Sequence, residues 1–319
     1  MLPNALQPSA TDHIPVLAAE VRELLAIRPG DTVVDATFGA GGHAGLLAAD
    51  LRGKGRLVAV DRDPAARAYF ERFRRRTGVQ ARFLRGEFAT VLGQLAANGI
   101  MVDAILLDLG VSSMQIDQSE RGFSYAVDAP LDMRMDPTAE ISAATLVSDL
   151  REQELETVFR RYGEERFARS IARAIVRRRS REPFERTGQL VDVIRAAIPA
   201  PARFGEGHPA KRVFQALRIA VNDELGQLEQ ALPAAVDMLR PQGRIAVISF
   251  HSLEDRIVKR FFRAESRGCV CPPDFPVCAC GREPLVRVVT PRAVRPSPAE
   301  IAANPRAASA RLRVAERTA

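Results

Sequence analysis

The sequence predicts an α/β protein in which a Rossmann-like parallel sheet is interrupted by a helical insertion. Short runs rich in β-branched residues alternate with helical patterns in the first third of the chain. Such alternation is typical of parallel strands joined by covering helices. It stops after Leu109, where polar turns and long helical patterns replace it, and it returns near residue 213. We therefore expect a single sheet built from both ends of the chain.

The expected elements follow from these patterns. Strands are expected over 32–36, 56–61, 81–85 and 103–108, with helices over 44–51 and 64–76 between them. Helical patterns then cover 143–179 and 187–197, and a passage rich in proline and glycine follows at 198–209. One helix over 213–239 and strands over 244–250, 285–290 and 310–315 complete the sheet. The predicted domains are a first sheet part at 1–113, a helical insertion at 114–212 and a second sheet part at 213–319.

Composition narrows the class of protein. The chain has 319 residues, 46% of them hydrophobic, which is enough for about two domains with cores. The net charge of +7 suits a polyanionic partner. No apolar run reaches the roughly 18 residues of a membrane span, and the first residues lack the pattern of a secretory signal. We expect a cytoplasmic protein without a membrane partner.

The strongest local feature is the passage 33–43, with the sequence VVDATFGAGGH. A buried strand runs there into a glycine-rich turn and then a helix, and a Cβ would block both the turn and the approach of a ligand. Asp61 ends the next expected strand, where its carboxylate can bind ribose hydroxyls. These features predict a site for a nucleoside-type cofactor.

Three interpretations of this turn remain open: S-adenosylmethionine, a dinucleotide or a purely structural turn. The spacing Gly39-x-Gly41-x-x-Ala44 also satisfies the dinucleotide fingerprint. S-adenosylmethionine is favoured because Asp35, just before the turn, can hold an ammonium group. The fourth strand also ends in an acidic and small polar segment, Asp108-Leu-Gly-Val-Ser-Ser113, which suits a methyl-acceptor loop.

The four cysteines lie together at Cys269, Cys271, Cys278 and Cys280. Structural zinc and four loop thiols without a ligand are both open interpretations, and no metal is assigned. The acceptor loop 108–113 contains no cysteine. Methylation at C5 of a pyrimidine needs a cysteine nucleophile, so direct transfer to an exocyclic nitrogen or an oxygen is favoured.

An arginine-rich stretch covers 160–181. At 100° per residue, four arginines share an arc of about 80°: Arg166, Arg169, Arg173 and Arg177. Phe167, Ile171, Ala174 and Ile175 lie on the adjacent face. This pattern predicts either a helix that follows RNA phosphates or an ordinary solvated face.

Other polar residues are weaker candidates. His43 can orient the cofactor or the substrate. Four carboxylates are candidate general bases, although turn or ion-pair roles are favoured for them: Asp132, Asp136, Glu164 and Asp255.

Several blocks together resemble the bacterial ribosomal RNA small-subunit methyltransferase H family, also called the MraW family. The blocks begin at His13, Asp35, Asp61 and Leu107 and continue with 120–124, 131–136, 162–167, 208–225 and 249–256. The resemblance extends from about residue 13 to residue 318. The chain departs from the family pattern at Met114, where proline is common, and at Ala308, where arginine is usual.

The resemblance implies a class I S-adenosylmethionine-dependent methyltransferase that methylates N4 of a cytidine in the decoding region of 16S rRNA, in the small ribosomal subunit. It implies cofactor contacts by Gly41, Gly42, His43 and Asp61, an adenine contact by Phe88, and Asp108 and Gln115 at the methyl-transfer end. No catalytic residue is assigned, although Asp108 is a candidate acceptor of the N4 proton. No obligate protein partner is evident.

Three other functions remain as alternatives. They are a methyltransferase for another amino nucleobase, a cofactor-bound assembly factor that needs no catalysis, and a nicotinamide dehydrogenase.

Overall fold

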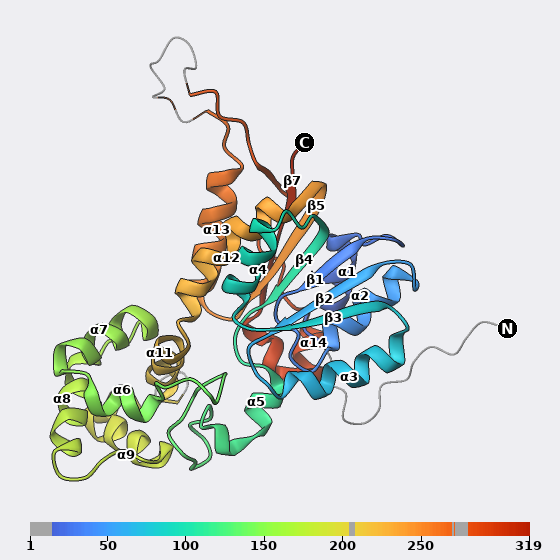
Figure 1. Cartoon of the computed structure of the whole chain (residues 1–319). Helices are drawn as coiled ribbons and strands as arrows, with labels where there is room; N and C mark the ends of the chain where they lie inside the picture. Colours follow the sequence, from blue (N-terminus) through green and yellow to red (C-terminus); the bar gives the residue numbers. More distant parts are fainter. Residues whose placement is uncertain (1–14, 204–207, 270, 272–279) are drawn as a thin grey trace. The chain divides into compact units, whose positions relative to one another are not determined.

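The computed structural model describes residues 15–203, 208–269, 271 and 280–319 (Figure 1). The chain divides into two compact units. The first unit comprises Met1–Gly110 and Gln227–Ala319, and the second comprises Val111–Gly226. Cys278 and His13 lie outside the described residues.

The first unit contains a sheet of seven strands in the order β3-β2-β1-β4-β5-β7-β6. The strands are β1 (Thr32–Asp35), β2 (Arg56–Asp61), β3 (Gln80–Arg85), β4 (Val102–Asp108), β5 (Leu239–Ser249), β6 (Val286–Val288) and β7 (Arg311–Arg317). β1 to β5 pair in parallel, whereas β7 is antiparallel to both of its neighbours. This arrangement confirms the predicted class I methyltransferase sheet. The strand order reverses between β1 and β4, which is where sheets of this type bind ligands.

Helices cover both faces of the sheet (Figure 1). One face carries α4 (Phe88–Ala97), α12 (Glu224–Met238) and α13 (Ser252–Glu265), and the other carries α1 (Ala18–Leu25), α2 (Gly42–Leu51) and α3 (Ala66–Thr77). Val34, Ile105 and Ile245 belong to the apolar cluster that includes Leu232 and Phe262. Because side chains alternate along a strand, the neighbouring residues are buried on the opposite face. α14 (Pro298–Ala303) and a 3-10 turn (Pro305–Ser309) precede β7.

The second unit is helical. Its elements are α5 (Ser113–Asp117), a 3-10 turn (Ser119–Arg121), α6 (Ala143–Asp149), α7 (Glu152–Gly163), α8 (Ala168–Arg179), α9 (Thr187–Ala197), α10 (Ala200–Arg203) and α11 (Lys211–Asn222). A separate core joins α6, α7, α8, α9 and α11, with Phe159, Ile171, Ile194 and Leu217 fully buried in it.

The helix expected over 213–239 is wrong, because the structure has two helices there. α11 ends at Asn222, and Asp223 adopts a left-handed conformation with φ 46° before α12 begins. Val213, Phe214 and Leu217 pack in the core of the second unit. The second unit therefore continues to Gly226, and the sheet returns later than the expected residue 213.

Among the described residues, no helix is both long and apolar enough to cross a bilayer.

Candidate cofactor site

The glycine-rich turn links β1 to α2 at the carboxyl edge of the sheet. Phe38 N–H donates to the carbonyl of Val60 at 2.9 Å, and Gly41 N–H donates to the carbonyl of Phe38 at 2.8 Å. Gly41 has φ 84°, and a Cβ on it would lie 2.7 Å from Cζ of Phe38. Glycine is therefore required at position 41 by both backbone and space. Gly42 follows as the first residue of α2.

Asp61, at the end of β2, fastens this turn. One carboxylate oxygen accepts from Gly39 N–H at 2.7 Å and the other from Asp63 N–H at 2.8 Å. Burial raises the pKa of Asp61 to about 6, although both N–H groups favour the ionised form. Asp61 thus ends β2, as the sequence predicts, and its carboxylate binds the turn. Each oxygen retains acceptor capacity for ribose hydroxyls.

His43 and Asp108 form a second part of the site. His43 Nδ1 lies 3.4 Å from Asp108 Oδ2, and His43 Nε2 lies 2.9 Å from the carbonyl oxygen of Val16. Burial lowers the pKa of His43, but the hydrogen bond and charge of Asp108 and the charge of Asp35 outweigh it, so the pKa is raised overall. A protonated ring can donate to both neighbours. Asp108 N–H donates to Thr37 Oγ1 at 2.6 Å.

Asp35, at the end of β1, is the most perturbed carboxylate of the site. Its side chain is fully buried, and burial raises its pKa to about 7 against the opposing charge of His43. Thr37 N–H donates to its Oδ1 at 3.2 Å. Among the described residues, Oδ2 of Asp35 and Oδ1 of Asp108 are buried without a hydrogen-bond partner. Two orphaned acceptors at one strand edge indicate a ligand that carries donors or positive charge.

The charge of this edge distinguishes the candidate cofactors. Asp35, Asp61 and Asp108 end neighbouring strands β1, β2 and β4. Each carboxylate attracts the ammonium and sulfonium groups of S-adenosylmethionine, whereas a dinucleotide would bring a doubly negative pyrophosphate to the same edge. The residues present therefore fit S-adenosylmethionine, and a Coulombic penalty opposes a dinucleotide.

Phe88 and Gln115 are predicted as cofactor contacts by the resemblance alone, and they lie in different units of the chain. Phe88 is half-buried as the first residue of α4, beyond the carboxyl end of β3. Gln115 is buried in α5 of the second unit, where its side-chain oxygen accepts from Ser112 N–H at 3.0 Å. The cofactor contacts of Phe88 and Gln115 remain predictions, and so does the cofactor contact of Gly42.

Sequence reasoning missed the residues that hold His43 and Asp108 in place. The carbonyl of Val16 fixes the ring of His43, and the hydroxyl of Thr37 accepts from the main-chain N–H of Asp108. The block beginning at His13 signalled that the first element matters. No sequence pattern, however, identifies a backbone carbonyl as a hydrogen-bond acceptor.

The weaker general-base candidates have structural roles. Asp132 pairs with Arg134 at 2.7 Å, and this arginine outweighs burial and lowers the pKa of the carboxyl. Asp255 pairs with Arg313 at 2.6 Å, and here too the arginine outweighs burial and lowers the pKa of the carboxyl. Asp136 accepts from Thr138 at a turn, and Glu164 ends α7 in a left-handed conformation. The ion-pair and turn interpretation of the sequence is therefore confirmed for these residues.

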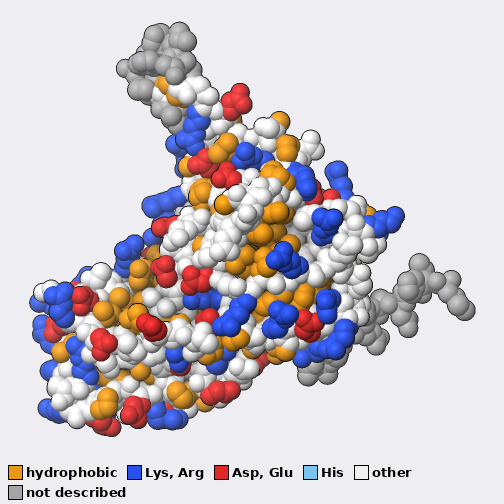
Figure 2. Space-filling model, in the orientation of Figure 1, with side chains coloured by type: hydrophobic (Ala, Val, Ile, Leu, Met, Phe, Trp, Pro, Cys, Tyr) orange, Lys and Arg blue, Asp and Glu red, His pale blue; other side chains and the backbone are white. Residues whose placement is uncertain are grey.

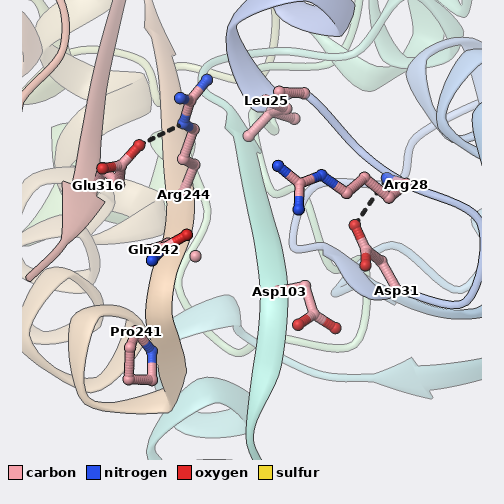
Figure 3. A pocket seen from close by; sticks show the side chains of 10 residues that line it. Leu25, Arg28, Asp31, Asp103, Pro241, Gln242, Arg244 and Glu316 are labelled. Carbon is pink, nitrogen blue, oxygen red and sulfur yellow. Dashed lines mark hydrogen bonds and ion pairs between the residues drawn. The ribbon is translucent and has the colours of Figure 1, made fainter. Parts of the chain in front are cut away.

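A cavity of about 170 Å³ lies at the opposite, amino-terminal edge of the sheet (Figure 3). Its carboxylates all have partners. Arg244 pairs with Glu316 at 2.9 Å, Asp31 accepts from the backbone N–H of Arg28 at 2.7 Å, and Asp103 accepts from the backbone N–H of Thr32 at 2.7 Å. These interactions join the amino-terminal ends of the strands to the loops before them.

The sheet order, the turn and the buried carboxylates together define a class I S-adenosylmethionine-dependent methyltransferase. The model of the MraW methylase family matches residues 10–318. The chain belongs to the MraW methylase family.

The relatives of the chain carry names that agree with this family. The ribosomal RNA small subunit methyltransferase H of Heliobacterium modesticaldum is 54% identical over 307 residues, covering 96% of this chain and 98% of the relative. The protein of the same name from Symbiobacterium thermophilum is 54% identical over 306 residues, covering 95% and 96%. An rRNA methylase structure from Streptococcus thermophilus is similar at a TM-score of 0.41 and 10% identity, covering 95% and 94%. That likeness is too distant to add to the fold assignment.

The raised pKa of Asp35 predicts pH-dependent cofactor binding. Below pH 7 the carboxyl gains a proton and loses its attraction for a cation, so affinity for S-adenosylmethionine should rise with pH and level off above about 7. Asp61 and His43 act in the same direction, since ionisation of the first and deprotonation of the second both favour a cation. Each group contributes at most about tenfold per pH unit. Calorimetric titration from pH 5.5 to 8.5 measures the dependence.

Asp35→Asn should lower the affinity and flatten the profile near pH 7. Asp103→Asn, at the other edge of the sheet, serves as the control and should keep the wild-type profile. A wild-type profile retained by Asp35→Asn would assign the dependence to the other groups.

Proposed function

We propose that this enzyme transfers a methyl group to N4 of a cytidine in the decoding region of 16S rRNA, within the small ribosomal subunit. The names of the relatives support ribosomal RNA of the small subunit as the substrate. The resemblance described above supports the base and its location. The proposal places the enzyme in the cytoplasm, where ribosomal subunits are assembled.

The observation that carries the reaction type is the setting of Asp108. Its side chain is 28% exposed at the end of β4, and one oxygen is held near His43 while the other has no partner among the described residues. A carboxylate so placed can accept a proton from an exocyclic amine. The acceptor loop 108–113 offers no thiol for covalent attack on the pyrimidine ring. Direct transfer to nitrogen fits both facts.

S-adenosylmethionine supplies an electrophilic methyl group on a positively charged sulfur. The chain's own residues then have two tasks. The turn and Asp61 hold the cofactor still, which matters because the cytosine amine is a weak nucleophile and its alignment supplies much of the rate. Asp108 accepts the N4 proton as the nitrogen gains its methyl group, with His43 fixing the orientation of the carboxylate.

The second unit supports an RNA-binding role. Arg166, Arg169, Arg173 and Arg177 are exposed on α8 or just before it, while Ile171 and Ile175 are buried. Figure 2 shows blue side chains, with carboxylates among them, along the left margin, where Figure 1 places α8.

Not every arginine of this helix is available to RNA. Arg179 donates to the carbonyls of Val147 and Leu150, so it supports the fold. Arg173 lies 3.5 Å from Glu152. In the described part of the chain, Arg169 and Arg177 have no ion-pair partner, so they are the strongest candidates for phosphate contacts.

The proposal is tested by incubating the enzyme with methyl-labelled S-adenosylmethionine and small subunits that lack the modification. The RNA is then digested and the labelled nucleoside identified by mass. Labelled N4-methylcytidine supports the proposal, and labelled 5-methylcytidine would overturn the mechanism. Cofactor binding without transfer would favour the assembly-factor function.

Asp108→Asn tests the proton acceptor. Asparagine keeps the shape but accepts no proton, so transfer at saturating cofactor should fall by about 10²–10⁴-fold. Loss of the carboxylate charge should lower cofactor affinity by a smaller factor. Single-turnover transfer and calorimetry measure the two quantities. Asp103→Asn, on the same strand, is the control and should transfer normally. Unchanged transfer would exclude Asp108 as the acceptor, and a parallel loss of binding would assign it to the cofactor.

Arg169→Ala combined with Arg177→Ala tests the RNA contacts. If both side chains contact phosphates, affinity for the small subunit should fall and the slope of log affinity against log salt should decrease by about 2. Binding is measured at several salt concentrations. Arg160→Ala, an exposed α7 arginine paired with Glu156, is the matched control. An unchanged slope in the double variant would refute the assignment.

A further inference from the structure

We propose that Cys269, Cys271 and Cys280 bind a structural zinc ion, at a site separate from the cofactor turn. Their three sulfur atoms all lie within 4.8 Å of one another. The Sγ atoms of Cys269 and Cys280 are 3.8 Å apart. Tetrahedral zinc with Zn–S bonds of about 2.3 Å places its sulfurs about 3.8 Å apart, whereas a disulfide brings them to about 2.05 Å. The spacing therefore fits metal ligands and not a covalent bridge.

The fold brings the two ends of this loop together. Leu285 N–H donates to the carbonyl of Glu265 at 2.8 Å. Arg282 donates to the carboxylate of Glu265 at 2.9 Å and to the carbonyl of Ala264 at 3.3 Å. The end of α13 and the segment before β6 are thus joined at the base of the loop. This base holds Cys269 and Cys280 next to each other although eleven positions separate them.

The backbone around the thiols has features of a ligand loop. Cys271 N–H donates to Cys269 Sγ at 3.4 Å, which stabilises negative charge on the sulfur. Gly281 follows Cys280 with φ 58°, a conformation that favours glycine. A Cβ on Gly268 would lie 3.3 Å from the carbonyl oxygen of Arg282, so the two sides of the loop approach closely just before Cys269.

Hydrophobic burial does not hold this segment. None of the described residues between Ser266 and Leu285 is buried. Cys269 and Cys280 are exposed, and Cys271 is half-buried. Small segments without a core are commonly stabilised by a metal or a disulfide. Zinc would fasten the two sides of the loop where side-chain packing cannot.

The donor set selects the kind of metal. Thiolates are soft ligands that favour zinc, copper(I) or iron–sulfur clusters over magnesium or calcium. We commit to zinc, since three or four tetrahedral thiolates form a closed structural site for it. Cys278 lies outside the described residues, so the assignment rests on the other three thiols.

The test measures the metal content of the full-length protein, purified under reducing conditions without chelator, by mass spectrometry of the elements. Close to one zinc ion per chain is expected. Cys269→Ser combined with Cys280→Ser should reduce the zinc to background. Glu283→Gln, an exposed change in the same segment, is the control and should keep it. Asp35→Asn should lose cofactor affinity and keep the zinc, which separates this site from the proposed function.

Thiol alkylation provides a second readout that does not depend on how well the double variant folds. In the wild-type protein, three or four thiols should resist alkylation until a chelator is added. Fewer than three protected thiols would overturn the proposal. So would iron with inorganic sulfide in place of zinc, or a disulfide found by mass under non-reducing conditions.

Discussion

Buried negative charge at the carboxyl edge of the sheet is the constraint on which the rest of the site depends. Parallel strands end at the same edge, so Asp35, Asp61 and Asp108 converge although the chain separates them widely. Backbone N–H groups of the turn and the ring of His43 offset part of this charge. Burial is the main reason why the pKa values of Asp35 and Asp61 are raised, and neighbouring carboxylates add to it. The negative charge that is left unbalanced explains why a cationic cofactor fits.

The second unit is inserted in the chain between β4 and β5, and these two strands still pair with each other. β4 and β5 pair in parallel with Leu106 opposite Ala246 and Asp108 opposite Ile248, although the whole second unit separates them in the chain. Loop-closure entropy grows only slowly with length, and the second unit has its own core. The insertion therefore leaves the pairing of β4 with β5, and with it the cofactor edge, undisturbed.

The sequence predicts what is local and misses what depends on distant packing. The strands and the turn at Gly41 follow from alternation and from the space a Cβ would need, and both are found. The division at Asp223 was not predicted, because an amphipathic pattern continues across it and only the core of the second unit decides where α11 ends. The bond between the Val16 carbonyl and His43 could not be predicted either, because every residue has a backbone carbonyl and no side-chain pattern marks this one.

Two blocks of the family resemblance, 131–136 and 249–256, illustrate the same limit. The block 131–136 is held by Asn222 of α11. The Asn222 side chain accepts from Met135 N–H and donates to the carbonyl of Met133, a residue with φ 61°. In the block 249–256, Asp255 joins α13 to Arg313 of β7. Both blocks are anchors of the fold, so the specificity of a motif does not by itself locate the chemistry.

The same carboxylates also bear on product release. When the methyl group leaves, the sulfur loses its positive charge, and the edge formed by Asp35, Asp61 and Asp108 loses a counter-charge. The attraction that favours the methyl donor is therefore weaker for the demethylated product, since the ammonium group alone remains to balance the buried charge. On charge alone, the three carboxylates thus attract the donor more strongly than the product.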